Sequence, residues 1–228
     1  MDNNITVVVV SREPQESRAN LIAMLERTCK ANLQIIYMYN NGCVGLTKIY
    51  NEMLERASTD IVCFIHDDIE FLKDGWGAEV LRLFDQHQDY GIIGVAGSAE
   101  FHDSAAWWTY KDIYGQVLHR SGGKSWLTTF SPLLKEDLQE VCVIDGLFMA
   151  VHKKRITKRF DEDFDQFNFY DISFCTANFL DGGTKIGVTT NIRIAHSSIG
   201  ETKQNWFDSK ELYLEKYSDY LPLYVKKK

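Results

Sequence analysis

The sequence predicts an α/β fold in which helices cover both faces of a mostly parallel sheet. Continuous apolar, β-branched runs alternate with segments of helical periodicity, and turn residues separate them. Runs of this kind are typical of strands buried on both faces, and right-handed crossovers lay such strands side by side. The 228 residues can bury this core without disulfides or structural metals.

The expected elements of the first half follow in order. Residues 5–10 are β-branched throughout and predict a buried strand, which the segment from Ser11 to Pro14 ends. Apolar residues at near-helical spacing predict a helix over 15–30. By the same criteria we expect strands at 33–39, 60–65 and 91–96, and helices at 44–57 and 74–88.

The second half is less regular. Residues 97–140 predict an irregular region, and regular structure returns at 141–151. A helix is expected over 170–180, closed by a C-cap at Asp181-Gly182-Gly183, with short strands at 185–188 and 191–195. Because there is no repeat or linker, we expect residues 1–228 to form one domain whose second half packs over the strand ends.

Composition excludes several classes of function. With 25 Lys+Arg against 32 Asp+Glu the net charge is −7, which argues against binding of nucleic acid or of anionic membranes. Five scattered cysteines without a C-x-x-C pair suit a reduced chain. The chain shows neither a secretory signal nor a run of about 20 apolar residues, so we expect a cytoplasmic protein. Three terminal lysines allow at most peripheral contact with the inner face of a membrane.

Two acidic residues stand where ligands of such sheets bind, beyond the carboxyl ends of the strands. Asp67 and Asp68 follow the expected strand 60–65 after one intervening residue, His66. Adjacent carboxylates at a buried strand end repel each other, and a divalent cation with oxygen ligands would neutralise them. Capping of the next segment by one of them is an equally good interpretation.

Other candidate residues also have two interpretations. His196 ends a short apolar strand, where a histidine by itself is more often structural, but a nearby carboxylate metal site favours a ligand. Asp171 begins the expected helix 170–180, where an acidic residue is commonly a cap. Trp107, Trp108 and Trp126 lie in the irregular region and either stack on sugars or pack in the core.

The order and spacing of several motifs resemble the A-type (GT-A) nucleotide-sugar glycosyltransferases over nearly the whole chain. The motifs are SREP after the first strand, GLTKIYNE, FIHDDIEF, GVAG, WW, VIDGLFMAV, RFDE, FYDISFC and AHSSIG. The chain looks like a short stand-alone bacterial branch of the inverting, family-2-like group, with H-D-D in place of D-x-D. The resemblance implies a mostly parallel central sheet flanked by helices, with a small second sheet.

The resemblance also implies a site. Asp68 and His196 would hold Mn²⁺ or Mg²⁺ against the diphosphate of the donor, and Asp171 would be the general base. Residues 1–97 would form the nucleotide-sugar-binding half and residues 98–228 the acceptor half. Donor contacts are expected from Ser11, Arg12, Asn40, Asn51, His66, Asp67 and Gly146.

The implied activity is metal-dependent, inverting transfer of a hexosyl or deoxyhexosyl group. The donor would be a nucleoside-diphosphate sugar and the acceptor a glycan or a lipid-linked sugar, as in the synthesis of surface polysaccharides. A non-catalytic module that binds sugar nucleotides or glycans is the alternative. A nucleotidyltransferase would need a glycine-rich basic loop after the first strand, and a dinucleotide-dependent oxidoreductase would need G-x-G-x-x-G there. The segment from Ser11 to Pro14 is neither.

Overall fold

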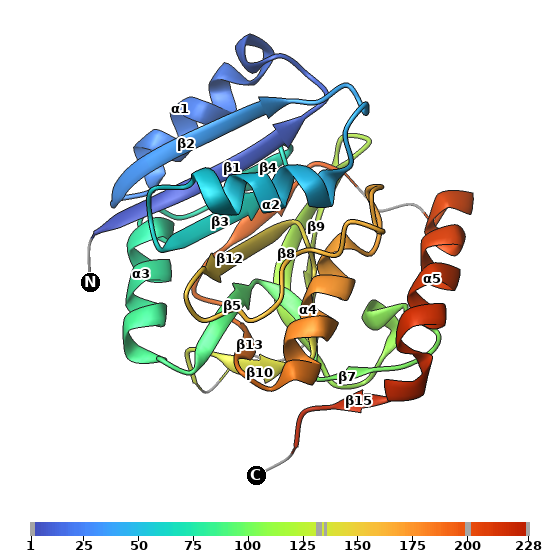
Figure 1. The fold of residues 1–228 in the computed structure, drawn as a ribbon. Helices are drawn as coiled ribbons and strands as arrows, with labels where there is room; N and C mark the ends of the chain where they lie inside the picture. Colours follow the sequence, from blue (N-terminus) through green and yellow to red (C-terminus); the bar gives the residue numbers. More distant parts are fainter. Residues whose placement is uncertain (1–2, 131–133, 135, 199–201, 227–228) are drawn as a thin grey trace.

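The computed structural model describes residues 3–130, 134, 136–198 and 202–226 (Figure 1). Within them, a seven-stranded sheet has the order β10-β13-β5-β12-β3-β1-β2. Strands β1, β2, β3, β5 and β13 run in one direction, and β10 and β12 run against them, which confirms the mostly parallel sheet. The strands are β1 (Asn4–Ser11), β2 (Asn32–Tyr39), β3 (Ile61–Ile65), β5 (Tyr90–Gly94), β10 (Gln139–Val141), β12 (Phe148–His152) and β13 (Lys185–Val188).

Helices lie on both sides of this sheet. In Figure 1, α2 and α4 lie in front of the strands, and α1 lies behind β1 and β2. The first expected helix is shorter than 15–30, because Gln15–Arg18 forms a 3-10 turn before the α-helix begins. Gly182 ends α4 with a φ of +70°, as expected of a C-cap. The helices are α1 (Ala19–Thr28), α2 (Leu46–Arg56), α3 (Trp76–Gln86), α4 (Tyr170–Asp181) and α5 (Gln204–Tyr217), of which α5 was not predicted.

A second sheet occupies much of the region expected to be irregular, so the expectation for residues 97–140 was wrong. Its order is β11-β6-β8-β14-β4, with β9 paired to β8. Gly122 and Gly123 form the two-residue turn of the β8–β9 hairpin with φ values of +57° and +73°. The strands are β4 (Ile69–Phe71), β6 (Ala96–Ser98), β8 (Ile113–Ser121), β9 (Lys124–Thr129), β11 (Val143–Ile144) and β14 (Ile194–His196).

Two apolar runs pass from one sheet to the other, whereas a single strand was expected at 91–96 and undivided regular structure at 141–151. The run 91–96 divides into β5 and β6, and the run 141–151 divides into β11 and β12 at Asp145-Gly146. The backbone N–H of Asp145 donates to the carbonyl of Ala96 at 2.9 Å, which joins the two crossing points. The junction of the sheets therefore lies beside the carboxyl end of β3, which pairs with β12.

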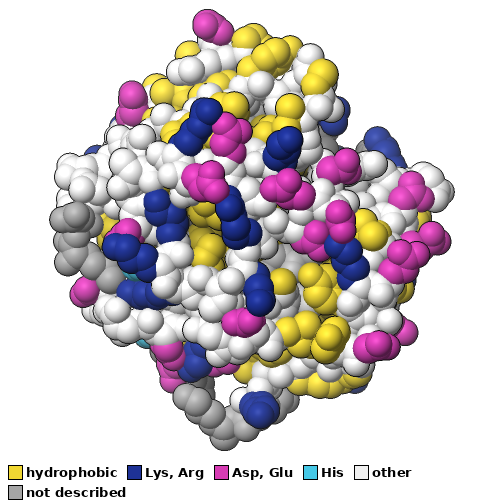
Figure 2. Space-filling model, in the orientation of Figure 1, with side chains coloured by type: hydrophobic (Ala, Val, Ile, Leu, Met, Phe, Trp, Pro, Cys, Tyr) yellow, Lys and Arg dark blue, Asp and Glu magenta, His cyan; other side chains and the backbone are white. Residues whose placement is uncertain are grey.

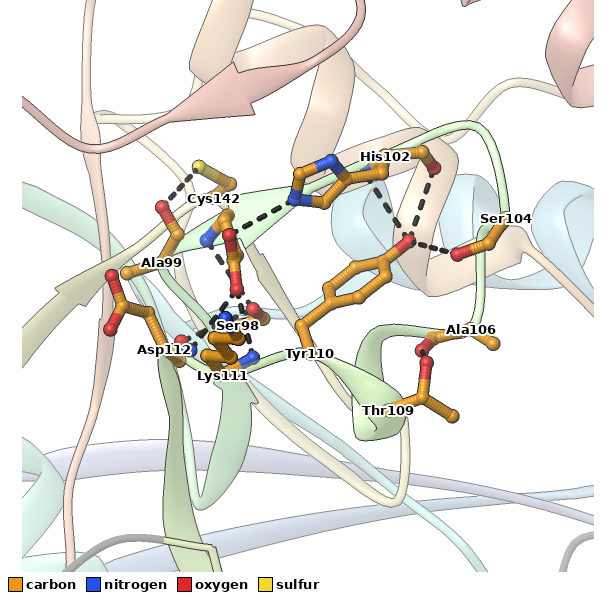
Figure 3. A network of polar contacts seen from close by, with 11 residues as sticks. Ser98, Ala99, His102, Ser104, Ala106, Thr109, Tyr110, Lys111, Asp112 and Cys142 are labelled. Atoms are coloured by element: carbon orange, nitrogen blue, oxygen red, sulfur yellow. Dashed lines mark hydrogen bonds and ion pairs between the residues drawn. The ribbon is translucent and has the colours of Figure 1, made fainter.

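Side chains rather than strands order much of the segment 98–112 (Figure 3). The carboxylate of Glu100 accepts the backbone N–H groups of Lys111 at 2.8 Å and Asp112 at 3.1 Å, and it lies 3.0 Å from Nε2 of His102. The hydroxyl of Tyr110 donates to the carbonyl of His102 at 3.1 Å. The adjacent β7 (Glu100–Phe101) pairs with β15 (Leu223–Tyr224) and so ties the C-terminal segment to this network.

The surface carries both signs of charge. In Figure 2, Lys and Arg side chains alternate with Asp and Glu side chains on the face that Figure 1 shows. Ion pairs between exposed side chains include Lys154 with Asp60 and Arg159 with Glu55. All five cysteines are free. Among the described residues, every helix is too short or too polar to cross a bilayer.

Candidate functional site

A cavity of about 270 Å³ opens at the carboxyl ends of β1 and β3, where the two sheets meet. It has close to the volume of a small-molecule site, and its walls combine apolar side chains with a few converging polar groups. The lining residues are Val10, Leu46, Tyr50, Ile65, His66, Asp67, Asp68, Ala96, Val117, His119, Phe130, Asp145, Leu147, Phe167, His196 and Ser198.

Three possible metal ligands converge in this cavity. His66, Asp68 and His196 each offer one ligand atom, and these atoms lie within 4.8 Å of one another. Nε2 of His196 is 3.2 Å from Oδ1 of Asp68 and 3.5 Å from Nδ1 of His66. Strand pairing holds them there, because β14 pairs with β4 and the N–H of Ser197 donates to the carbonyl of Asp68 at 3.0 Å. We call these three residues the His-Asp-His cluster.

Neighbouring hydroxyls orient the rings of the cluster. The hydroxyl of Tyr170 lies 2.9 Å from Nε2 of His66, so the other ring nitrogen, Nδ1, faces His196. The hydroxyl of Ser198 lies 3.0 Å from Nε2 of His196. A partner on the ring nitrogen that faces away from the cluster, as Tyr170 is for His66, commonly fixes the ligating nitrogen of a metal-binding histidine. Ser198 instead contacts the nitrogen of His196 that faces Asp68, so a bound cation would replace this contact. Two imidazoles and one carboxylate fit Mn²⁺ better than Mg²⁺, which prefers oxygen ligands.

The protonation states of Asp68 and His66 suit cation binding, whereas His196 would have to release a proton more readily than its surroundings favour. Burial by itself would raise the pKa of Asp68, but the hydrogen bond with His196 lowers it to about 2. The carboxylate of Asp68 is therefore ionised at neutral pH. Burial lowers the pKa of His66, and the neighbouring His196 lowers it further. The hydrogen bond to Asp68 raises the pKa of His196 despite its burial. His66 is therefore neutral at neutral pH, as a metal ligand must be.

The two adjacent carboxylates point to different partners. Asp67 accepts the hydroxyl of Ser11 and lies 3.0 Å from Nη2 of Arg18, whereas Asp68 faces His196. Arg12, which was expected to contact the nucleotide, is exposed. Arg18 takes the place beside Asp67 because the 3-10 turn Gln15–Arg18 brings it back over the end of β1. The sequence carried no signal for this, since residues 15–18 were read as part of one helix.

Three other expected donor contacts have local partners. Asn40 holds its own turn, accepting the N–H of Gly42 at 3.1 Å. Asn51 is buried in α2, where its amide donates to the carbonyl of Phe160 at 2.9 Å. Gly146 lies at the sheet junction and donates its N–H to Asp171. Asn40 and Asn51 thus shape the surroundings of the cavity from outside its described lining.

Asp171 lies directly behind the cavity wall. Its Oδ2 accepts the N–H of Gly146 at 2.7 Å, and its Oδ1 accepts the N–H of Ile172 at 2.8 Å. The N-cap of α4 is Phe169, so Asp171 stands in the first turn and is not the cap residue. Burial, together with the negative charge of Asp145, raises the pKa of Asp171 to about 7. That value suits a group that exchanges a proton at neutral pH.

Most residues that line the cavity were not predicted, and three of them are polar or aromatic neighbours of the cluster. Asp145 lines the cavity and accepts the N–H of Leu147 at 2.9 Å. A single carboxylate followed by glycine inside the apolar run 141–151 was an available signal for this residue. Phe167 packs beside His66 with ring centroids 5.1 Å apart. His119 comes from β8, a strand that was not expected, so no pattern pointed to it.

The tryptophans of the second half divide between the two interpretations. Trp107 is buried in the core. Trp108 and Trp126 are each 40% exposed. Trp108 packs against Trp206, and Trp126 stacks on His119 with ring centroids 5.6 Å apart.

Residues 5–221 match the sequence model of a family described as glycosyltransferase like. The chain belongs to this glycosyltransferase-like family. The resemblance recognised in the motif order is thereby confirmed. A search of the curated proteins finds no match to this glycosyltransferase-like chain.

Solved structures confirm the GT-A fold of this family member. GalNAc-T7 with UDP, GalNAc and Mn²⁺ superposes with a TM-score of 0.56 at 9% identity, over 95% of this chain and 49% of that one. TarS 1–349 of S. aureus superposes with a TM-score of 0.53 at 13% identity, over 85% of this chain and 60% of that one. A197 from STIV gives 0.51 at 13% identity, over 86% of each chain. The chain thus spans about half of the GalNAc-T7 chain, and these likenesses concern the fold alone.

Proposed function

We propose that this protein is a metal-dependent, inverting glycosyltransferase that moves a hexosyl or deoxyhexosyl group from a nucleoside-diphosphate sugar. The observation that carries the proposal is the His-Asp-His cluster in a cavity of a glycosyltransferase fold, with Asp171 directly behind the wall. Residues on both sides of residue 97 line this cavity, in keeping with a donor half and an acceptor half of one domain. The acceptor is a glycan or a lipid-linked sugar, and the cytoplasmic location stays a prediction.

The cluster provides for the charge of the leaving group. His66, Asp68 and His196 would hold Mn²⁺, which when bound neutralises the negative charge that develops on a leaving diphosphate. Tyr170 keeps the imidazole of His66 turned toward that position. On the other side, Arg18 and Ser11 hold Asp67 at the end of β1, next to the expected position of the nucleoside.

Asp171 is the general base in this proposal. With a pKa of about 7, a large fraction of its carboxylate is ionised at neutral pH and can accept the proton of the acceptor hydroxyl. The negative charge of Asp145 adds to the effect of burial in raising that pKa. A base opposite the leaving group inverts the configuration without a covalent sugar–enzyme intermediate, as in inverting glycosidases.

A thermal-shift screen tests the donor site. Nucleoside diphosphates and their sugars are added with Mn²⁺ or with EDTA, beginning with UDP and UDP-GalNAc because GalNAc-T7 was solved with UDP, GalNAc and Mn²⁺. We expect stabilisation that needs Mn²⁺ and is lost in Asp68→Ala. Asp60→Ala removes an exposed carboxylate that pairs with Lys154 and serves as the control. Equal stabilisation in EDTA, or in Asp68→Ala, contradicts the metal site.

Turnover tests the catalytic part of the proposal. Asp171→Asn is expected to bind the donor normally and to lose transfer. Retained transfer in Asp171→Asn together with loss in Asp145→Asn moves the base to Asp145. Saturable donor binding with neither hydrolysis nor transfer in the wild type identifies the protein as a binding module instead.

A further inference from the structure

A row of three aromatic rings leads from the His-Asp-His cluster to the surface. In the second sheet, His196 of β14 is the register partner of His119 of β8, and His119 is the partner of Trp126 of β9. Register partners on neighbouring strands project from the same face of a sheet. The ring centroids are 6.3 Å apart between His196 and His119 and 5.6 Å apart between His119 and Trp126.

Strand alternation places Trp126 on the cavity side of the hairpin. Val117 and His119 both line the cavity, and Leu118 between them points to the other face. Trp126 is opposite His119, whereas the exposed Leu127 is opposite Leu118. The sheet geometry therefore extends the cavity wall outward along β9, with Trp126 as its aromatic end.

The stacking arrangement leaves part of the indole available to a ligand. One face of Trp126 covers His119 at an interplanar angle of 23°, and the side chain is still 40% exposed. Strand β9 pairs with β8 alone among the described strands, so its outer edge is open. Nδ1 of His119 is buried without a partner among the described residues, so this imidazole keeps hydrogen-bonding capacity beneath the indole.

The position of Trp126 relative to the cluster favours contact with the acceptor over contact with the donor. Asp67, Ser11 and Arg18 interact on the β1 side of the cluster, which the proposed function gives to the nucleoside. Trp126 lies on the opposite side, two ring spacings from His196. A second sugar, approaching a donor that is held at the cluster, would meet this side of the cavity.

We propose that Trp126, supported by His119, is the stacking platform of the acceptor, and that the acceptor presents a pyranose ring there. The C–H face of a pyranose is apolar and its rim is polar, which matches an exposed indole beside hydrogen-bonding groups. This inference rests on the proposed function, because that function makes the ligand on this side an acceptor.

The chain contains a matched control. Trp108 is also 40% exposed, but it lies in a 3-10 turn, Trp107–Thr109, and packs against Trp107 and Trp206. Because Trp108 and Trp126 are equally exposed, a sugar that affects Trp126 alone is recognised by the position of that residue and not by any exposed indole.

The first test observes the indoles directly. The Nε1–H resonances of ¹⁵N-labelled protein are assigned from their loss in Trp126→Phe and in Trp108→Phe. Methyl β-D-glucopyranoside, methyl β-D-galactopyranoside and methyl α-L-rhamnopyranoside are then titrated with Mg²⁺ and UDP present, since Mn²⁺ would broaden the signals. We expect at least one pyranoside to shift the Trp126 resonance saturably and to leave that of Trp108 in place.

The second test uses transfer to the pyranoside that binds. Trp126→Ala is expected to raise the acceptor KM about tenfold, the effect of losing one aromatic stack, and to keep the Mn²⁺-dependent thermal shift with donor. Trp126→Phe, which retains a ring, is expected to lie between Trp126→Ala and the wild type, and Trp108→Ala to match the wild type.

The outcomes separate this inference from the proposed function. An unmoved Trp126 resonance, or an unchanged acceptor KM in Trp126→Ala, in a protein that still shows Mn²⁺-dependent donor binding overturns the platform alone. A wild type without Mn²⁺-dependent donor binding overturns the proposed function. In that protein, a saturable Trp126 shift supports a sugar site on the hairpin, and an unmoved resonance overturns both.

Discussion

Replacing Asp171 by asparagine is expected to make the protein more stable and less active. The pKa of Asp171 is about 7 against an ordinary value of 3.8. Since one pKa unit corresponds to about 1.4 kcal/mol, ionised Asp171 lowers the free energy of unfolding by about 4 kcal/mol above pH 7. Asparagine carries no charge, but its single carbonyl oxygen replaces only one of the two acceptors. The lost hydrogen bond to Gly146 or Ile172 costs about 1–2 kcal/mol.

The pH dependence identifies the cause. A raised carboxyl pKa means that the folded state holds a proton which the unfolded state has lost, so the wild type loses stability as pH rises from about 4 to 7. Asp171→Asn does not undergo this loss. The stability gained by the variant over the wild type should therefore be larger at pH 8 than at pH 5 by about 2–3 kcal/mol, and level above that.

The assay is urea unfolding of both proteins at pH 5, 6, 7 and 8 in EDTA. Asp181→Asn, at the opposite end of α4, is the control, because Lys158 lowers the pKa of Asp181 and no gain that grows with pH is expected. Transfer by Asp171→Asn at pH 7 should fall about 10²–10⁴-fold, the usual contribution of a general base. A stability difference that does not vary with pH refutes the raised pKa, and wild-type turnover refutes the role as base.

Three further substitutions test the surroundings of the cluster. Tyr170→Phe removes the hydroxyl that orients His66, so calorimetry should show Mn²⁺ binding about 10–100-fold more weakly. The control, Tyr213→Phe, removes another buried hydroxyl and should bind Mn²⁺ like the wild type. A Cβ at Gly146 would overlap the hydroxyl of Tyr170, so Gly146→Ala should lower the free energy of unfolding in urea by about 1–3 kcal/mol. A midpoint equal to that of the wild type would show that the junction of the two sheets can move. Gly122→Ala, at a φ of +57°, should cost about 1 kcal/mol and speed amide exchange in β8 and β9, and unchanged exchange would contradict a strained turn.

Local sequence patterns were enough to predict five of the seven strands of the first sheet, namely β1, β2, β3, β5 and β13. Strands β1 and β3 are buried on both faces, so continuous apolar runs marked them, and their ends marked where ligands bind. The same patterns could not divide the run 141–151, because β11 and β12 are both fully buried and differ only in the sheet they join. The hairpin β8–β9 escaped because it is partly exposed, and its glycines were read as signs of irregular structure.

The candidate site was predictable where it depends on strand ends, and not where it depends on pairing between strands. Asp68 and His196, expected to share a metal, lie 3.2 Å apart. Arg18 comes close to Asp67 only through a 3-10 turn. His119 comes close to His196 only through the register of β8 with β14. Asp171 was expected to face the acceptor, and its position behind Asp145 follows from the chain crossing between sheets at Gly146.

The two imidazoles of the cluster are separated by 130 residues in the chain, so the proposed cation site is completed late during synthesis. A ribosome adding roughly 5–20 residues per second needs about 7–26 s to pass from His66 to His196. Nascent chains that carry only His66 and Asp68 lack the third ligand, so manganese cannot stabilise them through this cluster. Retention on a manganese column should therefore separate finished molecules from prematurely terminated ones.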